Sequence, residues 1–205
     1  MIVTQLVELS KTRSKVYIDQ EFAFVLYKGE LRLYKVREGQ ELSQAQYDTI
    51  CRELLPKRAK LRAMNLLKSR DYTTEELRKK LKQGFYPEPV IEQALQYVTS
   101  FGYVDDLRYA VSYLQSYEGS KSVRRIQQDL QKKGISSSIW ESAYAKWQAE
   151  GGTQDESEMI NKLLHKRHYH SETADFKEKQ KTFAFLMRKG FSADAIRRAL
   201  QIVED

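Results

Sequence analysis

The chain has 205 residues, of which 41% are hydrophobic and 31% charged, so it can form one large or two small packed domains with a heavily charged surface. It contains no run of about 18 apolar residues, and its first residues lack a basic segment followed by an apolar one. We therefore expect neither a membrane-spanning helix nor a secretory signal. The net charge of +7 resides wholly in residues 51–205, because residues 1–50 hold seven basic and seven acidic side chains.

A basic excess of this kind favours an anionic partner, although a solvated helical surface rich in Lys and Arg explains the charge equally well. The single cysteine, Cys51, cannot form an internal disulfide, which fits a reducing, cytoplasmic setting. We interpret Cys51 as a small core residue rather than a nucleophile, because free cysteines are usually buried.

Residues 1–50 are predicted to form a β-rich extension that leads into a helix. Val16–Ile18 and Phe22–Tyr27 are rich in aromatic and β-branched residues, and the turn-like Asp19–Glu21 between them predicts a hairpin. Leu31–Val36 alternates apolar and polar residues, which predicts a half-buried strand.

A helix is expected to follow this extension, with Ser43 as its N-cap and Ile50 on its apolar face. Because a few short strands bury little surface alone, we expect the extension to pack on the helices that come after it.

From residue 57 onward the apolar spacing is helical and repeats three times. Leu81, Leu130 and Leu186 serve as equivalent anchors, 49 and 56 residues apart. At 9, 10, 13 and 14 residues after each anchor the sequence keeps its apolar character. These positions are Val90, Ile91, Ala94 and Leu95; Ile139, Trp140, Ala143 and Tyr144; and Ala195, Ile196, Ala199 and Leu200.

A glycine follows each anchor, in a position that suits a left-handed residue just past a helix end. The glycines are Gly84, Gly134 and Gly190, and Gly84 lies one residue closer to its anchor than the other two. Helix starts are marked by the candidate caps Thr73, Ser122, Ser136 and Ser192.

The pattern predicts a mainly α fold of tandem three-helix repeats, which would form an elongated curved array with a small N-terminal β-rich extension. The expected boundaries are 1–50 for the extension and 57–106, 107–155 and 156–205 for the three repeats.

Three segments in this helical part carry a resemblance to a known family. They are Leu61-Arg62-Ala63 with Glu76-Leu77-Arg78-Lys79-Lys80-Leu81, then Gly102-Tyr103-Val104-Asp105-Asp106 with Tyr109-Ala110, then Arg124-Arg125-Ile126 with Lys133-Gly134-Ile135. In this order they resemble segments of the RecX family, over about residues 57–205. The β-rich extension also resembles one found in some members. The chain departs from the family in the turn at Gly84, in the hairpin residues 19–21 and in a weaker third repeat.

The resemblance implies a cytoplasmic bacterial regulator that binds the RecA–DNA filament and lowers its ATPase and strand-exchange activity. It leaves open whether such a protein lines the filament groove or caps its ends, and whether basic side chains meet RecA or single- or double-stranded DNA. The candidate contact residues are Arg78, Lys79, Lys80 and Lys82 in the first repeat and Arg124, Arg125, Lys132 and Lys133 in the second. Their alternative reading is a solvated face or complementarity to helix ends.

Tyr109, Tyr113 and Tyr117 line one helix face, either as core or as an aromatic contact surface, and we favour the core. The short cluster His165, His168 and His170 lacks a carboxylate or thiolate neighbour and is interpreted as a polar loop.

We find no phosphate loop, catalytic triad or metal-binding spacing, so we expect no enzymatic activity, no cofactor and no membrane partner. Two rival functions remain open: a stand-alone DNA-binding helical protein and a repeat scaffold for another protein. Salt sensitivity separates them, since contacts to many phosphates weaken steeply with salt.

Overall fold

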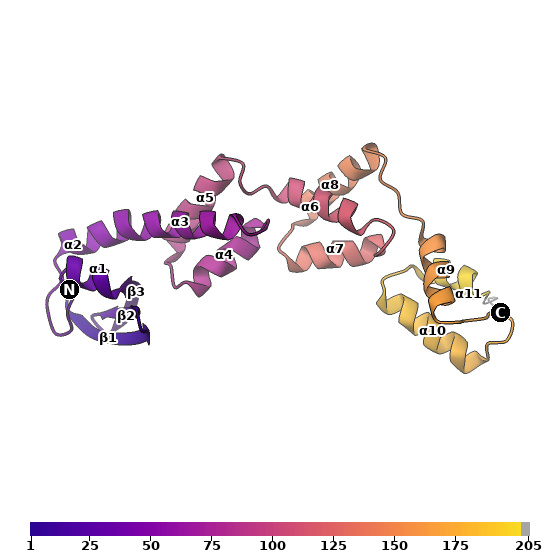
Figure 1. Cartoon of the computed structure of the whole chain (residues 1–205), viewed down its shortest axis with the longest axis horizontal. Helices are drawn as coiled ribbons and strands as arrows, with labels where there is room; N and C mark the ends of the chain where they lie inside the picture. The colour runs from indigo at the N-terminus through magenta and orange to yellow at the C-terminus, as the bar shows by residue number, and fades with distance from the viewer. Residues whose placement is uncertain (202–205) are drawn as a thin grey trace. The chain divides into compact units, whose positions relative to one another are not determined.

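The computed structural model describes residues 1–201, so residues 202–205 of the expected third repeat lie outside it. The chain divides into two compact units, one of residues 1–105 and a second that begins at Asp106 (Figure 1). The first unit holds a three-stranded sheet and one three-helix repeat, and the second holds two further three-helix repeats.

The sheet is antiparallel, in the order β1 (Val3–Ser10), β2 (Arg13–Ile18) and β3 (Glu21–Tyr27). The predicted hairpin is confirmed between β2 and β3. Its turn residues Asp19 and Gln20 both have positive φ, 49° and 73°, as a tight turn between twisted strands requires. Strand β1, which the sequence analysis did not predict, pairs with β2.

The strand predicted over Leu31–Val36 is wrong, because helix α1 (Lys28–Leu33) occupies this segment. Glu30 accounts for the difference: its carboxylate accepts the Tyr27 backbone N–H at 2.7 Å and so closes the first turn of the helix. A strand would place Leu31 and Leu33 on the same face, but in the helix Leu31 packs against the core while Leu33 is 71% exposed.

Helices α2 (Gln44–Thr49), η1 (Ile50–Leu54) and α3 (Leu55–Leu67) follow one another without a break. The Ser43 cap is confirmed, since its Oγ accepts the Gln46 N–H at 3.3 Å. In η1, a π-helical turn, the Leu55 N–H donates to the Ile50 carbonyl. This wider turn precedes Pro56, a residue that cannot donate to a helical ladder.

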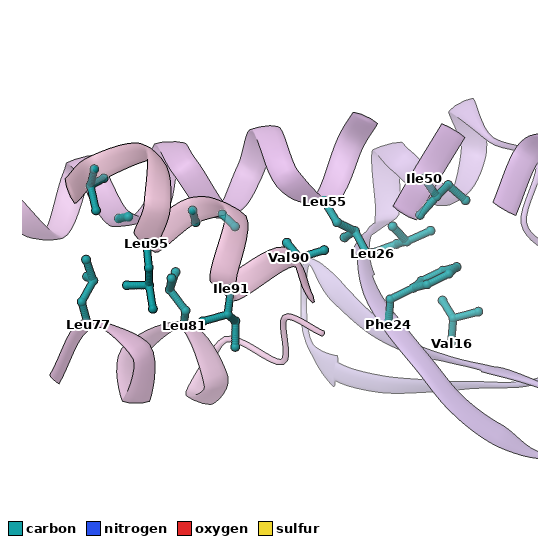
Figure 2. Close-up of a cluster of buried hydrophobic side chains, with 14 of the residues drawn as sticks. Val16, Phe24, Leu26, Ile50, Leu55, Leu77, Leu81, Val90, Ile91 and Leu95 are labelled. Carbon is teal, nitrogen blue, oxygen red and sulfur yellow. The ribbon is translucent and has the colours of Figure 1, made fainter. Parts of the chain in front are cut away.

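Helices α4 (Thr74–Gln83) and α5 (Glu88–Ser100) complete the first repeat with α3. The buried side chains of the sheet and of these helices form one continuous core, which confirms that the β-rich extension packs on the helices (Figure 2). Figure 2 shows Val16, Phe24 and Leu26 from the strands near Ile50, and Leu77, Leu81, Val90, Ile91 and Leu95 from α4 and α5.

Arg58 of α3 joins the helices to the sheet. Its guanidinium donates to the Val25 carbonyl at 3.1 Å and to the Glu30 carboxylate at 2.9 Å, and it lies 4.4 Å from the centre of the Tyr27 ring. The side chains of Arg58 and Glu30 are only 15% and 18% exposed. Removing one of them would therefore leave a poorly hydrated, unpaired charge.

The second unit contains α6 (Asp106–Tyr117), α7 (Val123–Lys132) and α8 (Ser137–Ala149), then α9 (Glu156–Lys166), α10 (Phe176–Arg188) and α11 (Ala193–Leu200). Each triplet encloses a core of its own. The three anchor leucines are fully buried, and the apolar positions that follow them are buried or half-buried in every repeat. The register read from the sequence is confirmed, as are the caps Thr73, Ser122, Ser136 and Ser192.

The second helix of each repeat ends in the same hydrogen-bonded turn. The anchor carbonyl accepts the N–H five residues later, from Tyr86, Ile135 and Phe191 at 3.5, 3.1 and 3.3 Å. The residue before that donor takes positive φ, which is Gly134 and Gly190 (both 89°) in the second and third repeats.

In the first repeat the left-handed residue is Phe85, with φ 63°, and Gly84 has an ordinary φ of −79°. The expected left-handed role of Gly84 is therefore wrong. The turn keeps its register from Leu81, so a phenylalanine occupies the position that glycine holds in the other repeats. Its ring lies 6.3 Å from that of Phe22 and 4.7 Å from the Lys15 ammonium, contacts that offset the backbone strain.

Substituting Arg58 by methionine should loosen the sheet from α3, because Glu30 loses its partner at a cost of about 3 kcal/mol. Hydrogen exchange followed by mass spectrometry should show protection falling about 100-fold in β3 peptides. The control is Arg52→Met, since Arg52 is 78% exposed and pairs with Asp48 only at 3.7 Å. Equal loss of protection in both variants would contradict the role given to Arg58.

Candidate nucleic-acid and partner interface

The Arg78 side chain of α4 faces carboxylates rather than open solvent. It lies 2.9 Å from Glu88 and 3.4 Å from Glu75, and it also forms hydrogen bonds with Glu92. The hydrogen bond that Arg78 donates to Glu92 raises the pKa of Arg78, and the same contact lowers the pKa of Glu92. Arg78 thus links α4 to α5, and its charge is balanced within the repeat.

The other basic residues of α4 are more exposed. Lys79 lies 3.6 Å from Glu75, and Lys82 lies 3.8 Å from Glu88, so both are loosely paired. Lys80 is exposed and has no ion pair within residues 1–201. Of the four candidates in this helix, Lys80 therefore retains the most available charge.

Helix α7 places its candidates differently. Arg124 and Lys132 are exposed, and neither has an ion pair in the described part of the chain. Arg125 lies 3.2 Å from Asp129 one turn further on, and Lys133 lies 5.6 Å from the centre of the Tyr109 ring. The structure brings Arg125 close to basic residues of the third repeat, whereas the α4 residues belong to the other unit.

The tyrosine stripe of α6 packs against the core of the second repeat, as expected, but each ring remains half-buried. The rings of Tyr109 and Tyr113 stack with their centres 6.3 Å apart, and those of Tyr113 and Tyr117 are 4.5 Å apart. The stripe thus forms part of the core and also presents aromatic surface at its edge.

Lys121, in the loop before α7, bridges this stripe to α7. Its ammonium donates to the Tyr113 hydroxyl at 3.0 Å and to Asp129 at 2.9 Å, and it lies 3.5 Å from the centre of the Tyr117 ring. Burial alone would lower the pKa of Lys121, but its hydrogen bonds to Tyr113 and Asp129 outweigh burial and raise it. Asp129 shows the reverse: burial favours its neutral form, yet the hydrogen bond from Lys121 keeps its pKa low. Both groups are therefore charged at neutral pH.

A pocket of about 460 Å³ lies between the second and third repeats, within the second unit. Lys121 and Arg125 line it from the second repeat, and Arg188 and Lys189 line it from the end of α10. Its other walls are Ser120, Ser122 and the apolar side chains Leu163, Phe185 and Phe191. Among the described residues, no carboxylate lines this pocket.

The two repeats meet at one side of the pocket through a close backbone approach. The Ser122 hydroxyl caps α7 and also donates to the Lys189 carbonyl at 2.9 Å. A Cβ on Gly190 would lie 2.6 Å from that hydroxyl oxygen and 3.2 Å from the backbone nitrogen of Arg125. Glycine is therefore required here both for its φ of 89° and for the space it leaves.

Sequence reasoning missed Arg188, Lys189 and Lys121 as candidates. The repeat register contained the signal for two of them, because Arg188 and Lys189 follow their anchor at the spacings of Lys132 and Lys133. Lys121 lies outside the repeated pattern, and only the fold brings it to Asp129.

Within residues 1–201, no helix is both long and apolar enough to cross a membrane. The same residues contain no group of three or more side chains placed to hold a metal ion.

The fold defines a protein of tandem three-helix repeats with an N-terminal sheet, and its second unit carries this basic pocket. Family comparison matches residues 59–97 to the first three-helix domain of RecX, residues 105–143 to the second and residues 154–200 to the third. The chain belongs to the RecX family.

Several relatives carry the name regulatory protein RecX. That of Vibrio vulnificus is 37% identical over 139 residues, covering 67% of this chain and 88% of that protein. That of Caldanaerobacter subterraneus is 27% identical over 204 residues, covering 98% of this chain and all of that protein. A crystal structure of regulatory protein RecX covers 98% of both chains with 26% identity and a TM-score of 0.62. A regulatory role follows from this family membership.

Substituting Gly190 by alanine should destabilise the chain more than the same change at Gly151. Both glycines have φ near 90°, so both variants strain the backbone by about 1 kcal/mol. Only Gly190 adds a steric clash, with Ser122, whereas a Cβ at Gly151 meets nothing within 4 Å. In thermal unfolding followed by circular dichroism, Gly190→Ala should lie at least about 3 °C below Gly151→Ala. Matching midpoints would show that the close approach at Gly190 is not needed.

Proposed function

We propose that this protein binds the RecA–DNA filament in the bacterial cytoplasm and lowers its ATPase, recombinase and strand-exchange activity. It acts by binding and performs no covalent chemistry. The observation that carries the proposal is the succession of the three RecX three-helix domains, in order, along residues 59–200.

The physical support is a set of cations that remain available for a partner. A filament repeats its acidic and phosphate groups along an axis, and a row of similar helical units can meet several of them. Lys80, Arg124 and Lys132 are exposed without described ion pairs. Lys79, Lys82 and Arg125 are each paired with a carboxylate of this chain, and a phosphate of a partner can replace that carboxylate. Arg78 and Lys133 contribute less, since one is held by glutamates and the other lies against Tyr109.

The second candidate is a stand-alone DNA-binding protein without a filament partner. The available cations favour it equally, but helix α8 does not suit base recognition. Its first turns contain Ile139, Trp140 and Glu141, and the first two of these pack toward the core. Any direct DNA binding is therefore expected to depend on phosphates rather than on sequence.

The decisive experiment measures ATP hydrolysis by the cognate RecA on single-stranded DNA while this protein is titrated in. The proposal expects inhibition at or below one copy per RecA subunit. An unchanged rate, with binding to free DNA intact, would favour the stand-alone reading instead.

Reversing the charges of Arg124 and Arg125 to Glu should raise the concentration needed for half inhibition about tenfold or more. The exposed Arg124 and the half-buried Arg125 would both become repulsive to an anionic partner. The control variant, Lys177→Glu with Lys179→Glu in α10, makes the same change in net charge and should shift the titration less than twofold. If a folded Arg124/Arg125 variant inhibits as well as the wild type, these residues do not form the contact.

A further inference from the structure

We propose that the pocket between the second and third repeats binds a nucleotide unit of single-stranded DNA, with a backbone phosphate among Lys121, Arg125, Arg188 and Lys189. This inference rests on the proposed function and deepens it, since it assigns one direct DNA contact to a defined site.

The charges around the pocket are concentrated and only partly balanced. Lys121 and Arg125 share one carboxylate, Asp129, which lies behind them at 2.9 and 3.2 Å. Arg188 and Lys189 are exposed and have no ion pair within residues 1–201. Counted over residues 1–201, four positive charges around the pocket are therefore balanced by one carboxylate, and a phosphate placed among them would be attracted from both repeats.

The backbone around the pocket holds these cations in position. The Ser122 hydroxyl both caps α7 and binds the Lys189 carbonyl, which fixes the start of α7 beside the end of α10. Lys121 and Ser122 precede α7, so the positive end of that helix also faces the pocket. The cations come from the start of α7 and the loop before it, and from the end of α10 and its C-cap, which the Gly190 turn brings together.

Aromatic surface distinguishes a nucleotide from an acidic peptide as the occupant. Phe185 lines the pocket and is half-buried, and its ring lies 5.6 Å from the Lys189 ammonium. Lys121 joins the pocket to the partly exposed edge of the tyrosine stripe through Tyr117. A nucleotide combines a phosphate with a flat aromatic base, and proteins that bind single strands pair cations with aromatic rings in this way. A volume of about 460 Å³ can accommodate such a unit.

The test measures binding of a fluorescent thymidine oligonucleotide to the full chain over a range of salt concentrations. Arg188→Gln with Lys189→Gln should weaken binding about tenfold at 0.1 M salt. It should also make the negative slope of log K against log salt shallower by about 0.7, since the contact with one backbone phosphate is lost. The matched control is Lys177→Gln with Lys179→Gln, which removes the same charge from the same helix about 14 Å or more away. It should change affinity less than twofold. Circular dichroism checks that both variants keep their helices.

If both double variants weaken DNA binding equally, the pocket is not the binding site, because net charge alone would then explain binding. No weakening by the pocket variant would exclude the pocket too. A labelled polyglutamate peptide serves as the acidic-protein probe: if the pocket substitutions reduce its binding more than that of DNA, the site takes acidic peptide instead. A Phe185→Leu variant should weaken DNA binding severalfold without changing the salt slope. An unchanged affinity would show that no base contacts the Phe185 ring.

The RecA assay separates this inference from the proposed function. If the pocket variant binds DNA normally while the wild-type chain inhibits RecA, the pocket fails and the proposed function stands. If the wild-type chain leaves RecA unaffected while the pocket variant loses DNA binding, the pocket stands as a DNA site and the filament role fails.

Discussion

The turn that closes the second helix of each repeat determines how the rest of the repeat packs. In all three repeats, the backbone carbonyl of a fully buried leucine accepts a hydrogen bond from the N–H five residues later. The residue immediately before that donor has a left-handed conformation. This turn sets the direction of the third helix and brings its apolar face back onto the leucine. A repeat of about 45 residues has little core of its own, so a misplaced turn would expose much of what it buries. In the third repeat the same turn, at Gly190, also contacts the start of α7.

The balance of charge differs among the repeats, and this difference bears on function more than the net charge does. In the first repeat, Glu75, Glu88 and Glu92 neutralise much of the basic face of α4. Between the second and third repeats, Asp129 is the one carboxylate of the described chain that pairs with the cations of the pocket, and it pairs with Lys121 and Arg125. Similar basic sequences thus give one face used largely for internal ion pairs and one that retains charge for a partner. The family relationship supplies the regulatory role, and we propose that an anionic partner binds where this charge remains available.

The periodic parts of the fold could be predicted from the sequence because they rest on local rules. The anchor leucines, the serine and threonine caps and the hairpin all depend on residues close in the chain. The segment after the hairpin could not be predicted, since Glu30 closes α1 and also binds Arg58, 28 residues away. Phe85 takes a conformation that glycine usually holds because its ring packs on Phe22 and near Lys15, both far off in sequence. For the candidate site, the sequence shows the excess of basic residues. It does not show that Arg78 is paired, because Glu88 and Glu92 reach its side chain only when α5 packs beside α4. The pocket depends on packing between repeats, which no local pattern encodes.

We propose that the chain recognises the RecA–DNA filament as an assembly, rather than RecA or DNA alone. Cosedimentation tests it most directly, with the protein added to RecA filaments on single-stranded DNA, to the same DNA alone and to RecA without DNA. We expect the protein to pellet with filaments at a saturating ratio, and with an affinity well above that for either component alone. Equal affinity for bare DNA and for the filament would rule out recognition of the assembly, because RecA would then add nothing to binding.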